Sequence, residues 1–189
     1  MELVFIRHAQ GEHTLNWPNQ LHMQHPALTE SGNQQAEQLR HLYPLVSGDV
    51  VVTSPARRTI ETVNIWSKDI SVQKYVTPLL GPRMFPQNPA WEPLGCDKIY
   101  TLEEVSTDYP DYTVVPSEQE LWKDGINTLS TEQFEYHADR FLKWLSRFKR
   151  TVYCITHDGT INSYRQFLGE SDVTREDFLR ETGVIRIRV

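Results

Sequence analysis

The feature of this sequence that most constrains the fold is a short apolar run that stops at a cation and a histidine. Residues 3–6 (Leu-Val-Phe-Ile) are continuously apolar, and Arg7 and His8 follow at once. A parallel strand covered by helices on both faces has no solvent side, so its sequence need not alternate between apolar and polar residues. The run therefore predicts a buried parallel strand with Arg7 and His8 at its carboxyl end, and Gly11 allows a tight turn beyond it.

Two later segments repeat this design. Residues 151–156 lead into His157, and residues 49–53 lead into Ser54 and, four residues later, Arg58. Ligands of open α/β sheets bind at the carboxyl ends of the strands. Imidazole and guanidinium groups gathered at one such edge would make a poor core but a good anion site, because arginine matches phosphate oxygens bidentately. The pattern predicts a phosphate-binding edge.

Helical patterns separate these strands. Ser54 with Pro55 is predicted to begin the helix that carries Arg58 in its first turn. Residues 184–189 alternate apolar residues with arginines, as is typical of an edge strand. Further helices are predicted to start at Thr29, Ser130, about Gly159 and Thr174, and a further strand at residues 72–76. This alternation predicts a three-layer α/β/α sandwich with a mostly parallel central sheet.

The segment from about residue 77 to residue 130 departs from that pattern. Prolines are dense as far as Pro116, which excludes a continuous helix or a central strand. Met84, Phe85 and Trp91 are nevertheless too apolar for a disordered linker. We therefore predict one domain, residues 1–189, with an ordered insertion at about 77–130 that folds over the sheet edge as a substrate cover. The competing interpretation is an excursion that only shields a hydrophobic face.

Composition narrows the class of partner. The net charge is −6 and residues of both signs are interspersed, so neither a general nucleic-acid surface nor a membrane surface is expected. No apolar run approaches the roughly 20 residues that span a bilayer, and we expect a soluble cytoplasmic protein. Cys96 and Cys154 do not suggest a disulfide framework. His22 and His25 lack an acidic or cysteine partner, so no metal site is predicted.

These motifs together resemble the histidine phosphatase superfamily, whose phosphoglycerate-mutase-like members carry an Arg-His-Gly/Ala loop near the N-terminus and a later His-Gly loop. The resemblance rests on Arg7-His8-Ala9, residues 28–36 (Leu-Thr-Glu-Ser-Gly-Asn-Gln-Gln-Ala), residues 54–58 (Ser-Pro-Ala-Arg-Arg) and residues 156–159 (Thr-His-Asp-Gly). It implies a phosphoglycerate mutase-like fold and attack by His8 on a phosphorylated small molecule. The resulting phosphohistidine would be hydrolysed by water, while Arg7, Arg58 and His157 hold the phosphoryl group, and no metal or organic cofactor would be needed.

The chemistry of the residues supports the role of His8. An imidazole attacks only when it is neutral, and the charges of Arg7 and Arg58 disfavour the protonated form of His8, which lowers its pKa. Arg57 competes with Arg58 for the phosphate, although the family's spacing from the serine favours Arg58.

Three other positions are candidates for substrate binding. Family members usually carry asparagine where this chain has Thr14, so either the Thr14 hydroxyl or the nearby Asn16 is a candidate for the contact with phosphate. Asp158, directly after His157, is the third.

The family's usual general acid is missing. It is commonly a glutamate soon after the third strand, but residues 78–83 read Pro-Leu-Leu-Gly-Pro-Arg. Glu92 is the leading candidate, because its apolar neighbours favour the protonated form that an acid requires. Asp97, Glu103 and Glu104 are the alternatives.

Three functions fit the sequence. The leading one is a phosphatase for small phosphomonoesters. A phosphoglycerate mutase-type phosphotransferase fits less well, because the resemblance implies that true mutases carry a longer insertion. A non-catalytic protein that binds phosphorylated ligands is supported by the missing acid but opposed by the presence of both histidines.

Overall fold

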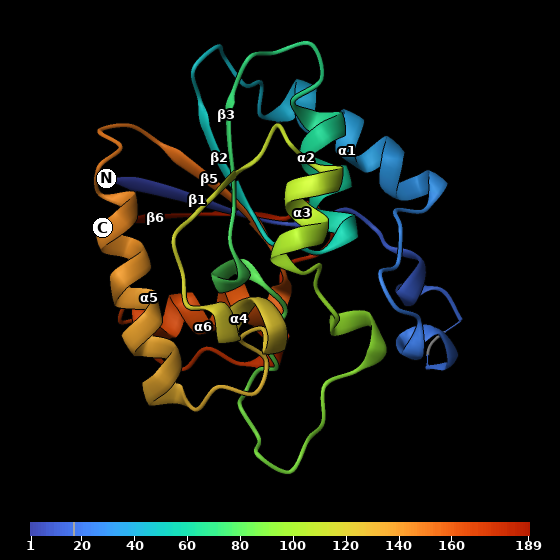
Figure 1. Ribbon diagram of the computed structural model, residues 1–189, viewed down its shortest axis with the longest axis vertical. Coiled ribbons are helices and arrows are strands. Elements are labelled where there is room, and N and C mark those ends of the chain that lie inside the picture. The colour runs from blue at the N-terminus through green and yellow to red at the C-terminus, as the bar shows by residue number, and fades with distance from the viewer. Residues whose placement is uncertain (17) are drawn as a thin grey trace.

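The computed structural model describes residues 1–16 and 18–189, which form a six-stranded sheet with helices on both faces (Figure 1). The strands lie in the order β4-β3-β2-β5-β1-β6. β1 to β5 are parallel, and β6 pairs antiparallel with β1 at the sheet edge. Their bounds are Glu2–Arg7 for β1, Val50–Thr53 for β2, Gln73–Val76 for β3, Thr113–Val114 for β4, Val152–Thr156 for β5 and Val184–Arg188 for β6.

The helices form the outer layers. α1 spans Glu30–Leu42, α2 Arg57–Trp66, α3 Leu102–Asp108, α4 Gln119–Asp124, α5 Thr131–Leu145 and α6 Asp158–Phe167. Short 3₁₀ turns lie at Glu12–Thr14 (η1), Asn19–His22 (η2), Pro78–Leu80 (η3), Gly95–Asp97 (η4) and Arg175–Asp177 (η5). Among the described residues, none of these helices is long and apolar enough to cross a membrane.

The two faces of the sheet pack against different helices. Leu3 and Phe5 of β1 belong to a core cluster with residues of α5 and α6, and the intervening Val4 and Ile6 pack with residues of α1 and α2. All four of these β1 side chains are fully buried. This burial on both faces explains the absence of polar alternation in the strand. The predicted three-layer α/β/α sandwich is confirmed.

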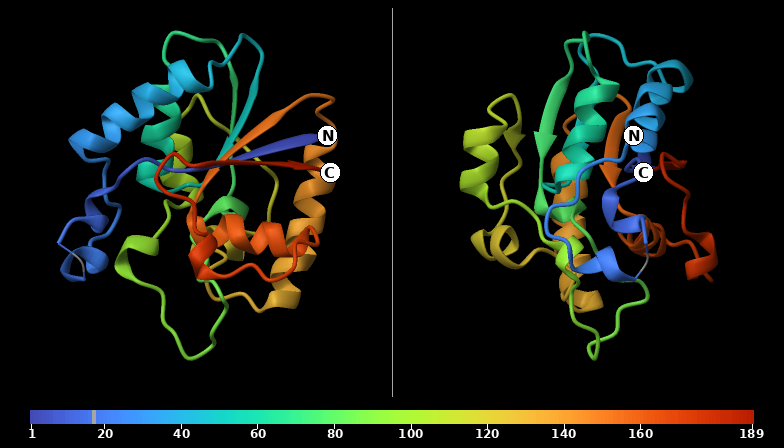
Figure 2. Two further views of the ribbon diagram at one scale, coloured as in Figure 1. Left: turned by 180° about the vertical axis from the view of Figure 1, so that it is seen from behind. Right: turned by 90° about the vertical axis from the view of Figure 1, so that its right-hand side faces the viewer.

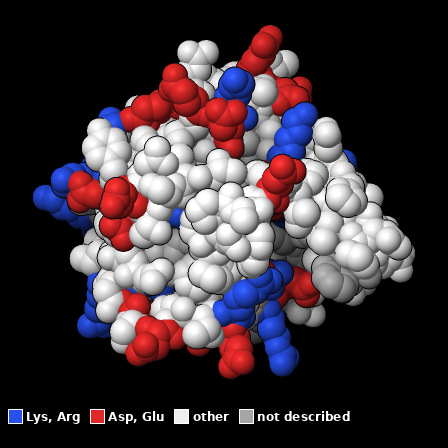
Figure 3. All heavy atoms as spheres, turned by 90° about the horizontal axis from the view of Figure 1, so that it is seen from below, with Lys and Arg blue, Asp and Glu red and all other residues white. Residues whose placement is uncertain are grey.

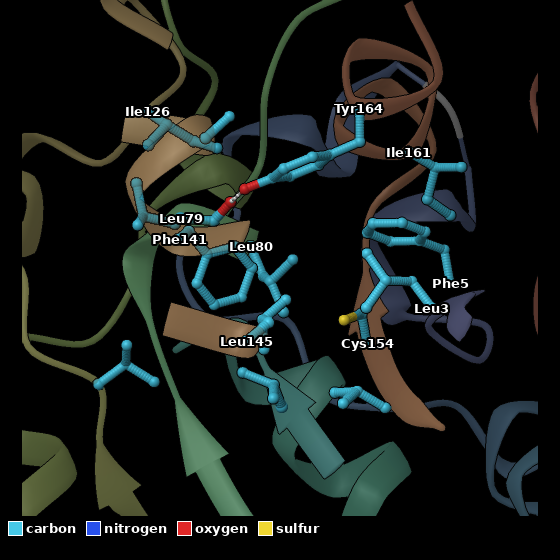
Figure 4. Packing of buried hydrophobic residues seen from close by; sticks show 14 of the residues in the cluster. Leu3, Phe5, Leu79, Leu80, Ile126, Phe141, Leu145, Cys154, Ile161 and Tyr164 are labelled. Atoms are coloured by element: carbon cyan, nitrogen blue, oxygen red, sulfur yellow. Dashed lines mark hydrogen bonds between the residues drawn. The ribbon is translucent and has the colours of Figure 1, made fainter. Parts of the chain in front are cut away.

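Tyr164 shows how the α6 layer is joined to the segment after β3. Its ring stacks on Phe5 with centroids 5.3 Å apart, and its hydroxyl donates to the Leu79 carbonyl at 3.0 Å (Figure 4). A buried tyrosine needs such a partner for its hydroxyl group. The contact therefore holds η3 against the carboxyl edge of the sheet.

Most predicted helix starts are confirmed. The Thr29 hydroxyl accepts from the Gly32 amide at the start of α1, and the Ser130 hydroxyl accepts from the Gln133 amide at the start of α5. Thr174 likewise caps a short helix, which is the 3₁₀ turn η5.

The prediction that Ser54 caps the helix of Arg58 is wrong. α2 begins at Arg57, with Ala56 as its N-cap residue and no side-chain cap. Ser54 is engaged elsewhere, because its amide donates to the Ile155 carbonyl at 3.2 Å and its hydroxyl contacts the His157 ring. Arg58 still lies in the first turn of α2, as expected.

The segment at residues 77–130 contains more regular structure than its prolines suggested. β4 extends the sheet beside β3, and α3 and α4 contribute Val105, Leu121 and Trp122 to the two core clusters. Residues 82–94 form an irregular loop that projects beyond the carboxyl ends of the strands in both views of Figure 2. The region thus combines core-forming helices with a loop at the sheet edge.

Candidate active site

Three adjacent strands bring the predicted residues together. His8 directly follows β1, His157 directly follows β5, and Ser54 directly follows β2, and these strands are neighbours in the order β2-β5-β1. The His8 amide continues the β1–β5 ladder by donating to the Thr156 carbonyl at 2.9 Å. The ring centroids of His8 and His157 are 5.1 Å apart. Sheet topology therefore places both imidazoles at one edge.

Arg58 connects the two imidazoles. Its Nε donates to His8 Nε2 at 3.1 Å, and its Nη2 lies 3.1 Å from His157 Nδ1. Its Nη1 donates to the Cys96 carbonyl at 2.8 Å, and the whole side chain is buried. Because a guanidinium group only donates hydrogen bonds, the ring nitrogen that it meets in each histidine carries a lone pair.

The remaining ring nitrogens agree with this assignment. His8 Nδ1 lies 2.7 Å from the Ala9 carbonyl, which only accepts, so Nδ1 carries the proton. His157 Nε2 lies 3.0 Å from the Ser54 hydroxyl oxygen and donates to it. His8 is therefore the Nδ1–H tautomer, with the lone pair of Nε2 directed toward Arg58.

The environment keeps both histidines neutral. Burial is the largest cause that lowers the pKa of His8 well below its ordinary value, and the charges of Arg58 and Arg7 lower it further. The pKa of His157 is lowered by burial and then by Arg58. The sequence predicts a lowered pKa of His8 from the arginine charges alone, and the structure adds desolvation as the larger effect.

His13 is a third buried imidazole that was not predicted. Its ring centroid lies 5.7 Å from that of His8, and burial followed by the charge of Arg58 lowers its pKa to about 3. Its Nδ1 is buried without a hydrogen-bond partner among the described residues. Gly11 leaves space for this ring, because a Cβ there would lie 2.7 Å from His13 Nδ1. Gly11 is extended (φ −102°), so close approach, and not the expected tight turn, explains the glycine.

Arg7 and Asp158 form an ion pair at the same edge. Arg7 Nη2 lies 2.9 Å from Asp158 Oδ2, and Nη1 donates to the Leu179 carbonyl at 2.7 Å. Nε of Arg7 is buried without a partner among the described residues. Asp158, predicted to bind substrate, is thus in position but holds Arg7. Arg7 as a residue nevertheless lines the cavity at this edge.

A cavity of about 690 Å³ opens over these groups. Thr14 lines it, and its hydroxyl donates to the Gly11 carbonyl at 2.8 Å. Asn16 is exposed and is not among the described residues that line the cavity. Of these two alternatives, the structure places Thr14 nearer to the predicted site. The arginines, histidines and carboxylic acids of the lining are Arg7, His8, His13, Arg58, Arg83, Glu92, Asp97, His157, Asp158 and Arg175.

The apolar lining comes largely from the loop after β3. It consists of Leu21, Pro82, Met84, Phe85, Trp91, Leu94 and Phe178. Figure 3 views the molecule from below, toward the carboxyl ends of the strands, and shows acidic and basic side chains interspersed around a broad neutral area. The cavity thus has a charged end at the sheet and apolar walls beyond it.

The candidates for the general acid differ in position. Glu92 lines the cavity but is exposed, whereas Asp97 also lines it and is half-buried. Burial is the largest cause that raises the pKa of Asp97. Glu103 and Glu104 lie in the first turn of α3, away from the cavity lining, and the Glu104 carboxylate accepts from the Thr101 amide.

The choice between the two adjacent arginines is clear from their contacts. Arg57 is exposed and its Nε lies 2.7 Å from Glu61 Oε1, one helical turn away. Arg58 lies between the imidazoles. The structure therefore places Arg58, and not Arg57, in the candidate site.

Sequence reasoning missed Ser54 and Asn127 as well as His13. Ser54 positions the His157 ring, and the Asn127 amide donates to Asp97 Oδ2 at 2.8 Å. A serine directly after a predicted strand, beside two others that end in histidine, was a usable signal for Ser54. Asn127 lies 30 residues from its partner, and no local pattern marks it.

Comparison with known proteins agrees with this architecture. A model of the histidine phosphatase superfamily (branch 1) matches residues 3–188. A search of the curated proteins found no match. Among solved structures the chain is similar to Bacillus stearothermophilus YhfR, with 20% identity and a TM-score of 0.63 over 100% of this chain and 91% of that one.

Two phosphatases are also similar in structure. One is the α-ribazole phosphatase from Shigella flexneri, with 21% identity and a TM-score of 0.61 over 100% of this chain and 91% of that one. The other is phosphoserine phosphatase from Entamoeba histolytica, with 20% identity and a TM-score of 0.58 over 98% of this chain and 89% of that one. At these identities the solved structures establish the fold, and the family match extends over nearly the whole sequence. The chain belongs to the histidine phosphatase superfamily.

Proposed function

We propose that this protein is a phosphatase that hydrolyses small phosphomonoesters through a phosphohistidine at His8. The observation that carries the proposal is the position of His8 Nε2, whose lone pair faces the cavity-lining Arg58 while the opposite ring nitrogen is bonded to Ala9. A neutral imidazole held in this tautomer is a competent nucleophile. The named phosphatases among the similar structures support the same class of reaction.

The surrounding cations would hold the phosphoryl group. Phosphoryl transfer depends mostly on positioning and on stabilising charge on the equatorial oxygens. Arg58 and Arg7 supply guanidinium N–H groups at the charged end of the cavity. His157 would bind a phosphoryl oxygen through Nδ1 once the substrate dianion has raised its pKa enough for protonation. The substrate phosphate would thus replace the imidazole nitrogens as the acceptor for Arg58.

The size and lining of the cavity indicate which kind of substrate fits. A volume of about 690 Å³ exceeds what a phosphate group alone requires and suits a small molecule. Met84, Phe85 and Trp91 face this space beyond the charged end. We therefore propose that the substrate is a phosphomonoester whose alcohol has an apolar or aromatic surface. We also propose that the enzyme is cytoplasmic and acts without nucleic-acid or membrane partners.

The test is hydrolysis of 4-nitrophenyl phosphate by the purified protein and by the His8→Ala variant. The leaving group of this ester needs little proton donation, so the assay depends on the nucleophile and the cations. We expect release of phosphate by the wild type and a loss of at least about 10³-fold in the variant. A wild type that binds inorganic phosphate but hydrolyses no ester would support the alternative of a phosphate-binding protein. Transfer of the phosphoryl group to a second alcohol in preference to water would instead support a mutase-type phosphotransferase.

A further inference from the structure

The reaction requires a proton for the leaving oxygen, and the phosphate-binding groups described above do not provide it. Arginine does not release its proton in proteins. His157 donates its Nε2 proton to Ser54, and the proton that its Nδ1 would take up with substrate is directed to a phosphoryl oxygen rather than to the leaving oxygen. A carboxylic acid is the remaining class of donor. Three carboxyl groups lie among the described residues that line the cavity: Glu92, Asp97 and Asp158.

Two of these carboxyl groups lack the surroundings of an acid. Asp158 Oδ2 lies 2.9 Å from Arg7 Nη2, and its Oδ1 accepts from the Gly159 amide at 2.7 Å, so both of its oxygens are already engaged by donors. Glu92 is exposed, as are its neighbours Trp91 and Pro93. The apolar residues beside Glu92 in the sequence therefore do not desolvate its carboxyl group.

Asp97 is held in one orientation by two donors to the same oxygen. The Leu94 amide donates to Oδ2 at 3.0 Å, and Asn127 Nδ2 donates to it at 2.8 Å. The Asn127 side chain cannot reverse, because its Oδ1 accepts from the Met84 amide at 2.6 Å. Among the described residues, the thiol of Cys96, at 4.0 Å, is the one hydrogen-bond partner of Asp97 Oδ1. This oxygen is therefore the one on which a proton would reside.

The backbone next to Asp97 is joined to the candidate phosphate site. The carbonyl of Cys96 accepts from Arg58 Nη1 at 2.8 Å, so η4 is attached directly to the guanidinium that contacts His8. Gly95 permits the close packing of this turn, since a Cβ there would lie 2.3 Å from the His22 carbonyl oxygen. Asp97 is thus fixed relative to the nucleophile through one residue of backbone and one side chain.

We propose that Asp97 is the general acid of this enzyme, donating a proton from Oδ1 to the leaving oxygen. The inference rests on the proposed phosphatase function. The bond between His8 Nε2 and phosphorus forms while the ester P–O bond breaks, and the proton of Asp97 passes to the departing alkoxide to give the alcohol. In the second step the Asp97 carboxylate takes a proton from water as its oxygen bonds to phosphorus, and the P–N bond breaks. Phosphate, neutral His8 and protonated Asp97 result.

The charge environment of Asp97 supports this role. Burial raises the pKa of its carboxyl group above the usual range, and the negative charge of Asp158 acts in the same direction. The hydrogen bonds from Leu94 and Asn127 and the charge of Arg58 oppose the shift without reversing it. The protonated form is therefore more accessible at Asp97 than at a solvated aspartate.

The test compares Asp97→Asn with Glu92→Gln, because each change replaces a carboxyl group by the amide of the same shape. Both variants and the wild type are assayed with glycerol 3-phosphate, whose alkoxide leaves poorly, and with 4-nitrophenyl phosphate. For Asp97→Asn we expect kcat/KM to fall by roughly 10²–10⁴-fold with the alkyl ester and by less than about 10-fold with the aryl ester. Glu92→Gln should show no such dependence on the leaving group, so any change in kcat/KM should be the same with both esters.

The dependence on the leaving group separates an acid from a structural residue. Equal losses with both esters in Asp97→Asn would overturn the assignment, because a disturbed fold affects both substrates alike. A selective loss with the alkyl ester in Glu92→Gln would assign the acid to Glu92 instead. A wild type that hydrolyses neither ester would contradict the phosphatase function itself, and with it this proposal, whereas an active wild type allows Asp97 to be judged separately.

Discussion

Arg58 Nε lies 3.1 Å from His8 Nε2, so the guanidinium group occupies the lone pair of the nitrogen that we propose attacks phosphorus. Before His8 can attack, the Arg58 Nε–H must exchange its hydrogen bond to His8 Nε2 for one to an oxygen of the substrate. This exchange frees the lone pair of Nε2. One side chain thereby couples binding of the phosphate to exposure of the nucleophile. The second contact of Arg58, with His157 Nδ1 at 3.1 Å, gives that imidazole the same dependence on substrate.

Replacing Arg58 by lysine tests whether this forked geometry is needed. A lysine keeps the charge but cannot contact two imidazoles and a carbonyl with fixed planar donors. We expect Arg58→Lys to lower kcat/KM for 4-nitrophenyl phosphate by at least about 10²-fold. Arg57→Lys is the matched control, because Arg57 is exposed and pairs with Glu61, and it should stay within about twofold of the wild type. A larger loss in Arg57→Lys would place the phosphate at the neighbouring residue.

Replacing Trp91 tests whether the apolar part of the cavity contacts the substrate. It lines the cavity yet is 45% exposed, so its removal should leave the core intact. We expect Trp91→Ala to raise KM for 1-naphthyl phosphate by about 5–10-fold and to leave KM for glycerol 3-phosphate unchanged, because only the former presents an aromatic surface. Tyr136→Ala removes an aromatic residue that is 59% exposed on α5 and should alter neither value. An equal change with both substrates would argue against an apolar leaving-group site at Trp91.

The burial of His13 should make the protein less stable against unfolding in mild acid. Its pKa is about 3 in the folded protein, against an ordinary value of 6.5, so the unfolded chain binds the extra proton between these values. Its contribution is fully present above pH 6.5 and is lost as the pH falls toward 3. The free energy of unfolding is measured with urea at pH 7 and at pH 5, for the wild type and for His13→Asn. The fall in this free energy from pH 7 to pH 5 should be about 2 kcal/mol smaller in the variant than in the wild type. Equal declines would show that His13 is accessible to protons in the folded state.

The parts of the site that could be predicted from sequence are those that local chain order determines. His8, His157 and Arg58 each follow an apolar run directly or within the first helical turn, and parallel pairing then brings them to one edge. β4 was not predicted because it is only two residues long, lies at the sheet edge and is flanked by Pro110 and Pro116. Strand length and alternation carry no signal in such an element.

The parts that escaped prediction depend on contacts between distant segments. Asp97 was ranked below Glu92 because Trp91 and Pro93 are apolar, but those neighbours are exposed in the structure, while Asn127 and Arg58 surround Asp97. The burial of His13 and the effect of the Arg58 charge on it have the same origin. The desolvation of a titratable group depends on which segments pack around it in the fold. Its neighbours in the sequence are therefore a poor guide to the shift of its pKa.

The most direct measurement is the detection of phosphate bound covalently to His8. Wild-type protein is mixed with 4-nitrophenyl phosphate, quenched rapidly in alkali, which preserves phosphohistidine, and digested for mass spectrometry of the peptide that contains His8. We expect phosphate that is stable to alkali and labile to acid on His8, and none on the protein from His8→Ala, which lacks the nucleophile. Phosphate trapped on another residue, or turnover by His8→Ala at the wild-type rate, would contradict the assignment of His8 as the nucleophile.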